Sequence, residues 1–329
     1  MSGVAAIVSS LDPHEVWLYT PTAAQQLGLE VRRIDTENYD PFRDYGAVKG
    51  PVRLTTGLAA VIHNRTTTVY GITNYTDAKG NKASTVSSLS PVYNPIDATT
   101  TSVADPGDYN AIAAASDGET SDYVYFLQDP EGVSQKPLIT EYGFQQSTMG
   151  TRYVYTGLNP DPSSNLAAVI EKSKGTRMMI FQNYKDATLY YAWSNTKSSG
   201  SASKRHKNPI TGSNNAVLGT PLAATLIPFP DSTFEVYLYY VDNTQQLWRV
   251  IYTGTQPVGG WGSPTAVGAV TDVDPSSGLA VVSDKTGNYI FFKANPNRYN
   301  YYHDSFKQPI LGEDDANDGH NEGVERGCN

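Results

Sequence analysis

Short apolar segments alternate with polar turns along the whole chain, and one of these segments recurs at a nearly fixed spacing. The motif Gly57-Leu58-Ala59-Ala60-Val61 has near copies, in which the first alanine falls at positions 5, 59, 113, 167, 223 and 280. The steps between these alanines are therefore 54, 54, 54, 56 and 57 residues. Six units of similar length that fill a chain are typical of a repeat architecture.

Every unit shows the same order of predicted elements. The small-residue segment comes first, and a polar turn separates it from a second segment rich in aromatic and β-branched residues, which favour strands. These second strands are expected at 16–19, 68–72, 123–126, 178–181, 236–240 and 289–292. A third strand is clearest at 189–193 and 246–251, and a less regular fourth segment ends each unit.

The length of the unit separates two repeat architectures. A β-solenoid coil has at most roughly 30 residues, whereas units above about 40 residues with four short strands are typical of β-propeller blades. The alanine pairs suit innermost strands that converge on a central channel. We therefore predict an all-β fold, a six-bladed β-propeller with four-stranded antiparallel blades, over residues 1–311. Its units start near residues 3, 57, 111, 165, 221 and 278.

Composition and charge bear on which classes of partner the chain is expected to bind. The formal net charge is -9, but six acidic residues lie after Gly312, so we expect residues 312–329 to form an acidic flexible tail. A nucleic-acid partner is not expected, because binding a phosphate backbone requires a concentrated basic face. A membrane span is not expected either, because no run of 18 apolar residues occurs.

Two features bear on assembly and localisation. Cys328 is the single cysteine; we expect it to be an incidental tail residue, and a disulfide-linked homodimer is the alternative. Sequons at Asn64 and Asn74 predict N-glycosylation, and with it the secretory pathway or secretion. No signal peptide is visible, so an intracellular protein is the alternative.

The fifth unit resembles the fungal fucose-binding lectins, which are six-bladed propellers with a sugar site between neighbouring blades. The resemblance is carried by Leu222-Ala223-Ala224, residues 236–240, Leu247-Trp248-Arg249 and Gly259-Gly260-Trp261. In that family an arginine on the second strand anchors the sugar. By alignment its place is taken here by Trp17, Tyr70 or a neighbour, Tyr123 or Val124, Met178, Tyr237 and Tyr289.

The loss of this arginine has a direct consequence. Aromatic side chains cannot replace the five N–H donors of a guanidinium, so most fucose sites are expected to be lost while the fold is kept. Arg177 stands one place before Met178, and a shift of register there would restore one site.

The chain also resembles the divergent lectin-type propellers that act as hetero-Diels–Alderases in fungal tropolone–sesquiterpene biosynthesis. That resemblance implies an intermolecular [4+2] cycloaddition between a tropolone quinone methide and a humulene-type alkene, assisted by orientation and hydrogen bonding in an aromatic pocket. No cofactor and no metal are expected, in keeping with the absence of phosphate-loop, metal-ligand and nucleophile-elbow motifs.

We expect the substrate groove between the fourth and fifth units, where usable side chains are densest. Its predicted substrate-binding residues are Trp193, Tyr237, Tyr239, Trp248 and Trp261. Arg249 is the predicted catalytic donor, and His63, expected at the channel mouth, is the next candidate. The alternatives are that the aromatic rings only pack between blades, that Arg249 stacks on Trp248 or Trp261, and that His63 is structural.

Two other functions stay open at this point. One is a fucose- or glycan-binding lectin with altered sites, and the other is a structural or interaction protein without a small ligand.

Overall fold

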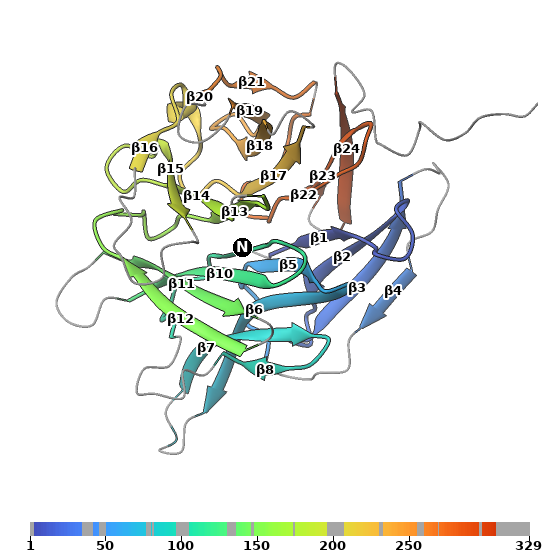
Figure 1. Ribbon diagram of the computed structural model, residues 1–329, viewed down its shortest axis with the longest axis vertical. Helices are drawn as coiled ribbons and strands as arrows, with labels where there is room; N and C mark the ends of the chain where they lie inside the picture. Colours follow the sequence, from blue (N-terminus) through green and yellow to red (C-terminus); the bar gives the residue numbers. More distant parts are fainter. Residues whose placement is uncertain are drawn as a thin grey trace, which may run out of the picture.

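The computed structural model shows six small antiparallel sheets arranged around a central axis (Figure 1). The residues that it describes are 3–34, 42–45, 51–76, 80, 82–96, 105–129, 136–145, 148–173, 175–195, 207–229, 233–254, 260–268, 270–295 and 298–306. The predicted tail 312–329, with Cys328, lies outside these residues. Among them the single helix is a 3₁₀ turn at Ser213–Asn215, and no helix is long and apolar enough to cross a membrane.

Each sheet is one blade and comes from one continuous stretch of chain. Blade 1 contains β1 (Ala5–Val8), β2 (Glu15–Pro21), β3 (Leu27–Arg33) and β4 (Phe42–Tyr45). Blade 2 contains β5 (Leu58–His63), β6 (Thr66–Thr76), β7 (Lys82–Ser90) and β8 (Asn94–Pro95). Blade 3 contains β9 (Ile112–Ser116), β10 (Ser121–Gln128), β11 (Leu138–Gln145) and β12 (Thr148–Tyr155).

The second half of the ring follows the same order. Blade 4 contains β13 (Leu166–Glu171), β14 (Thr176–Gln182), β15 (Leu189–Asn195) and β16 (Lys207–Pro209). Blade 5 contains β17 (Leu222–Pro228), β18 (Phe234–Val241) and β19 (Leu247–Gly254), with β20 (Gly260–Trp261) and β21 (Thr265–Ala266) both paired to β19. Blade 6 contains β22 (Ala280–Ser283), β23 (Gly287–Asn295) and β24 (Arg298–Ser305). The predicted all-β six-bladed propeller is confirmed, with three described strands in blade 6 instead of the expected four.

The alanine-rich strands form the inner ring. Each of β1, β5, β9, β13, β17 and β22 contacts the innermost strands of both neighbouring blades, and β22 contacts β1, so the ring is closed. A Cβ on Gly57 would lie 2.9 Å from the Asn110 carbonyl oxygen, and one on Gly278 would lie 2.8 Å from the Val4 nitrogen. Glycine at these positions therefore lets neighbouring blades approach closely.

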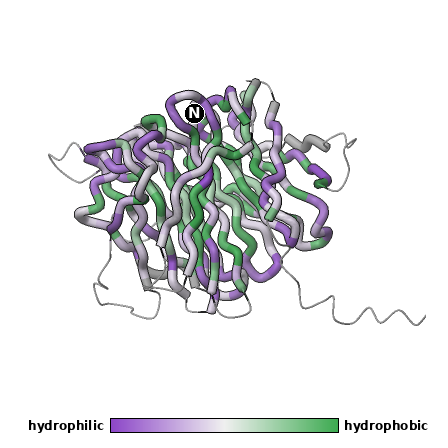
Figure 2. Tube along the Cα trace, turned by 90° about the horizontal axis from the view of Figure 1, so that it is seen from above, coloured by the Kyte–Doolittle hydropathy of each residue, from purple (hydrophilic) through white to green (hydrophobic). Residues whose placement is uncertain are grey.

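The hydrophobic core is divided among the interfaces between blades. The described residues form six clusters, one for each pair of neighbouring blades. Successive side chains on a strand point to opposite faces: on β18, Phe234 and Val236 pack toward blade 4, whereas Tyr237 and Tyr239 pack toward blade 6. Figure 2 shows hydrophobic stretches through the body of the molecule and hydrophilic stretches at many of the turns.

Candidate functional site

The predicted groove between the fourth and fifth units does not hold all the residues assigned to it. Trp193, Trp248 and Trp261 pack in the interface between blades 4 and 5. Tyr237 and Tyr239 lie on the opposite face of β18, in the interface between blades 5 and 6. The expectation of one groove is therefore wrong, because alternate positions on β18 and β19 face different neighbours.

The tryptophans of the blade 4–5 interface form a packed aromatic cluster. The ring centroids of Trp193 and Trp261 each lie 5.5 Å from that of Tyr252, with nearly edge-on geometry. Trp193 is buried, and the Trp248 indole Nε1 donates to an Asp242 carboxylate oxygen at 2.8 Å. Such edge-to-face contacts stabilise the interface by about 0.5–1.5 kcal/mol per pair beyond area burial. The arrangement is that of blade packing.

Arg249 is tied to blade 6. Its Nη1 donates to both carboxylate oxygens of Asp304 at 2.7 Å, and the Tyr239 hydroxyl donates to the same carboxylate at 2.6 Å. Burial opposes the charge of Arg249, but the hydrogen bonds and charge of Asp304 outweigh it and raise the pKa of Arg249. The expected stack on Trp248 does not form either, because Trp248 lies on the other face of β19. Arg249 is thus a link between blades.

The strand registers show which residues occupy equivalent positions in the six blades at the place that the sequence alignment assigned to the lectin arginine. The residue three places after the first residue of each Leu-Ala-Ala-Val segment pairs with Trp17, Thr68, Tyr123, Met178, Tyr237 or Tyr289. In blade 2 the position is therefore Thr68, a neighbour of the expected Tyr70. None of the six residues is basic.

Arg177 does not restore a lectin-type anchor. It lies on the face of β14 toward blade 3, whereas Met178 faces blade 5. Its Nη2 donates to Glu141 and to the Ser194 hydroxyl, each at 3.0 Å, and its guanidinium carbon lies 3.8 Å from the centroid of the Tyr123 ring. Arg177 and Glu141 are both buried, so their interface is filled by protein side chains.

His63 lies between blades 2 and 3. Its Nδ1 is 3.1 Å from Asp122 Oδ1, and the two side chains are 13% and 6% exposed. Both residues line a cavity of about 750 Å³, which we call the interblade pocket. The expected place at the channel mouth is taken by its near neighbour Arg65. Asn64 lines the interblade pocket, and the next residue, Arg65, lines the cavity at the channel mouth.

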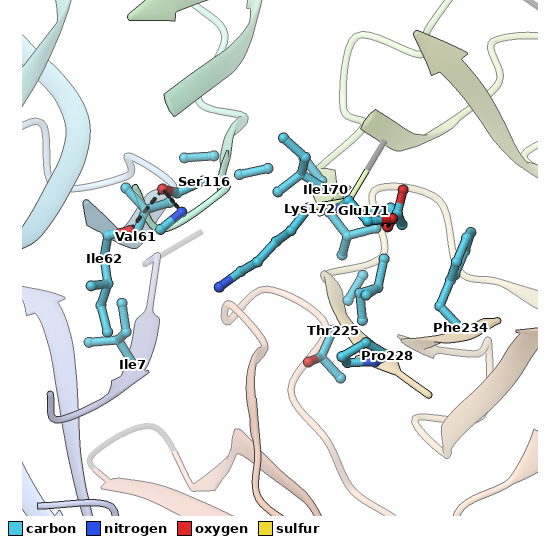
Figure 3. A pocket seen from close by; sticks show the side chains of 18 of the residues that line it. Ile7, Val61, Ile62, Ser116, Ile170, Glu171, Lys172, Thr225, Pro228 and Phe234 are labelled. Carbon is cyan, nitrogen blue, oxygen red and sulfur yellow. Dashed lines mark hydrogen bonds between the residues drawn. The ribbon is translucent and has the colours of Figure 1, made fainter. Parts of the chain in front are cut away.

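The channel mouth itself holds a cavity of about 660 Å³, which we call the channel-mouth pocket. Its walls are mostly aliphatic and aromatic: Ile7, Ala60, Val61, Ile62, Ala114, Ala115, Ala168, Val169, Ile170, Leu226, Phe229 and Phe234 line it. Its charged lining residues are Arg65, Glu171 and Lys172, and hydroxyl side chains come from Ser10, Ser116, Ser173, Thr225 and Thr233. Figure 3 shows the Lys172 side chain extending into the middle of the cavity.

Lys172 is one of two cationic residues that line this pocket, with Arg65 as the other. Its ammonium passes over Gly118, where a Cβ would lie 3.1 Å from Nζ, and no described residue forms an ion pair with it. Glu171 instead accepts hydrogen bonds from the backbone N–H, at 2.9 Å, and the hydroxyl of Ser173.

This site was not predicted from the sequence, because the alanine pairs were interpreted only as innermost strands around the channel. The sequence signal that could have indicated the site is Lys172, a charged residue directly after the innermost strand β13. In the described part of the chain, no group of three or more His, Cys, Asp or Glu side chains could hold a metal ion.

Comparison with solved structures shows the same architecture in lectins. The six-bladed Aleuria aurantia lectin, a fungal protein described with a fucose recognition mode, matches 91% of this chain and 90% of its own at a TM-score of 0.63 and 17% identity. The AofleA protein of Arthrobotrys oligospora matches with a TM-score of 0.61 and 13% identity, over 94% of this chain and 88% of its own. At these identities the likeness establishes the fold, a fucose-lectin-like six-bladed propeller.

Comparison of sequences identifies closer relatives, although no protein-family model matches the chain. The wall-associated proteinase of Coccidioides posadasii is 34% identical over 245 residues, which are 71% of this chain and 72% of that protein. Its counterpart in Coccidioides immitis is 32% identical over 244 residues, with the same coverage. This chain therefore belongs to the same protein family as the wall-associated proteinases of Coccidioides.

Proposed function

We propose that the protein binds an apolar small molecule bearing a carbonyl oxygen in the channel-mouth pocket, and that it promotes an intermolecular hetero-Diels–Alder cycloaddition there. The observation that carries this proposal is the Lys172 ammonium extended into a mostly apolar cavity of about 660 Å³. Ligand pockets commonly have about 300–1,000 Å³, apolar walls and a few convergent polar groups.

For this cycloaddition the protein needs to orient the two substrates and to supply one hydrogen-bond donor. A quinone methide supplies the C=C–C=O heterodiene and the alkene supplies two electrons. One C–C and one C–O bond form, and no proton, electron or leaving group is exchanged. A cation at the carbonyl oxygen stabilises the charge that develops there, and Lys172 can supply it. The aliphatic wall would hold the alkene against the heterodiene, which removes much of the entropic barrier to association.

A glycan-binding function is the second candidate. It is favoured by the fucose-lectin-like fold and by the open interblade pocket, where Tyr70, Tyr93 and Phe144 offer rings for a sugar face. It would have to use other anchors than the lectin arginine, because Thr68 occupies that position in blade 2.

The sequence relatives are called wall-associated proteinases, which adds peptide hydrolysis as a third candidate. At 34% identity it is a reasonable activity to assay. Cleavage of labelled casein by the purified chain, with a mock-purified control, tests it directly.

The main proposal is tested with the full chain, a quinone methide generated from a tropolone precursor, and humulene. We expect faster adduct formation and an excess of one stereoisomer compared with the uncatalysed reaction. Lys172→Met should lower the rate by about 10²-fold, as removal of an oxyanion donor commonly does. Lys172→Arg should keep part of it.

Lys185→Met is the matched control, because Lys185 is exposed and outside the pocket. Equal rates for Lys172→Met and Lys185→Met would contradict the channel-mouth assignment. A glycan array with the same protein separates the second candidate: micromolar sugar binding without cycloaddition would replace the proposal.

A further inference from the structure

The His63–Asp122 pair opens on a cavity that the proposed cycloaddition does not use. His63 ends the innermost strand of blade 2, and Asp122 lies on β10 of blade 3, so the pair forms only when the two blades meet. Both side chains line the interblade pocket. A pair of titratable side chains beside a cavity is a candidate binding or catalytic site.

The direction of the hydrogen bond follows from the groups involved. His63 Nδ1 lies 3.1 Å from Asp122 Oδ1. When the Asp122 carboxyl is ionised it only accepts hydrogen bonds, and His63 Nδ1 then carries the proton. In the neutral imidazole Nε2 then holds a lone pair. No described residue is hydrogen-bonded to this nitrogen. Asp122 therefore fixes the tautomer in which His63 can act as a base.

The Asp122 side chain is buried. Burial raises the pKa of Asp122, and hydrogen bonding with Ser116 and His63 opposes that effect. Tyr70 packs nearby and feels the same charge, since burial and then the charge of Asp122 raise its pKa. Asp117, whose own pKa is lowered by hydrogen bonds from Ser121, Glu119 and Thr120 in spite of burial, is the other charge that acts on Asp122.

Three aromatic side chains also line the interblade pocket. Tyr70 and Phe144 are stacked with centroids 6.0 Å apart, and Tyr93 lines the same cavity. The amide side chain of Asn94 also lines it and is a donor for an oxygen that gains negative charge. A cavity of about 750 Å³ lined by aromatic rings suits an aryl group joined to a carbonyl.

We propose that the interblade pocket hydrolyses aryl esters, with His63 as general base and Asp122 as the residue that positions it. His63 Nε2 takes a proton from a water molecule, and the water oxygen bonds to the ester carbonyl carbon. The tetrahedral intermediate then breaks its bond to the aryl oxygen, and the imidazolium returns the proton to that leaving group. Ester and water give carboxylic acid and phenol, and the pair is regenerated. Water is the nucleophile, because no described hydroxyl is hydrogen-bonded to His63.

The test uses the full chain and 4-nitrophenyl acetate, with release of nitrophenol as the readout. General acid–base catalysis contributes about 10²–10⁴-fold, so His63→Gln should lower kcat by at least about 10²-fold with little change in KM. Asp122→Asn should lower kcat and alter its dependence on pH, because the tautomer is no longer fixed. His14→Gln is the matched control, since His14 is exposed and outside the pocket.

Two further measurements distinguish loss of the catalytic base from misfolding and from loss of substrate binding. Circular dichroism and thermal unfolding of each variant separate misfolding from loss of the base, and Phe144→Leu should raise KM while leaving His63 in place. Equal rates for folded His63→Gln and His14→Gln would overturn the proposal, and so would a stoichiometric burst of nitrophenol, which indicates a covalent acyl intermediate. This readout is independent of the cycloaddition assay, so either proposal can fail without the other.

Discussion

The guanidinium of Arg249 donates from Nη1 to both carboxylate oxygens of Asp304 at 2.7 Å. The two residues come from the third strands of blades 5 and 6, 55 positions apart in sequence. The strongest donor that the sequence suggested for catalysis is thus occupied in holding neighbouring blades together.

We expect Arg249→Met to weaken the fold and to leave the proposed cycloaddition unaffected. The change leaves the partly buried Asp304 carboxylate without its charged partner, which costs about 1–3 kcal/mol. Urea unfolding should show the loss of stability, while the folded variant should match the wild type in an assay of the proposed cycloaddition. A variant with unchanged stability and a much lower rate would place the site at the blade 5–6 interface instead.

Breaking the buried ion pair Glu141–Arg177 should lower the stability of the fold more than Arg249→Met does. Glu141→Gln leaves the buried Arg177 charge uncompensated, and breaking a buried pair in this way costs about 3–5 kcal/mol. The double variant Glu141→Leu/Arg177→Met removes both charges and should recover most of that loss. Denaturant midpoints of the three proteins measure it. If the single variant is as stable as the double one, Arg177 is compensated by other groups.

Gly57 tests the close approach of the inner strands. A Cβ there would lie 2.9 Å from the Asn110 carbonyl oxygen, which belongs to the backbone and cannot rotate away. Gly57→Ala should therefore lower the free energy of unfolding by about 1–3 kcal/mol, as overpacking does. Gly260→Ala is the control, because nothing lies within 4 Å of its added Cβ. Equal thermal stability of both variants would show that blades 2 and 3 can move apart freely.

The Asp242 carboxylate should make stability depend on pH. Burial tends to raise its pKa, but hydrogen bonds from Thr244, Gln246 and Trp248 prevail and lower it below the ordinary 3.8. A lowered folded pKa means stability that is present above the ordinary value and is lost as the pH falls through the folded one. Asp242→Asn should thus cost about 1–2 kcal/mol at pH 7.

That difference should shrink as the pH falls below about 4, because the wild-type carboxylate is then protonated too. Unfolding in urea at pH 7, 4 and 3 measures the trend, with the exposed Asp272→Asn as control. A constant difference at all three pH values would contradict the assigned cause.

The two predicted glycosylation sites differ in their surroundings. Asn64 lies in the exposed two-residue turn between β5 and β6, whereas the Asn74 Oδ1 accepts hydrogen bonds from Arg53 Nε and Ser84 Oγ at 3.3 Å. After expression in a secreting yeast, a larger fraction of the chains should therefore be glycosylated at Asn64 than at Asn74. Intact mass should drop on Asn64→Gln and change less on Asn74→Gln. Loss of all glycan on Asn74→Gln alone would reverse this order.

The sequence alone determined the fold. The Leu-Ala-Ala-Val repeat marks the inner strand of every blade, because small side chains are needed wherever six strands converge, and local strand and turn preferences do not depend on distant residues. The replacement of the lectin arginine was also predicted from the sequence, because the alignment needs only the order of residues along one strand. These features are local or periodic, and a pattern of residues records them directly.

The tertiary structure decided which side chains share a site. Tyr237 and Trp248 belong to one blade but face different neighbours, and the split depends on the relation between β18 and β19. His63 and Asp122 are 59 residues apart and meet only across an interface. Lys172 reaches the channel because the ring brings six inner strands to one axis. Contacts between blades arise from packing in three dimensions, which the order of residues in one blade does not record.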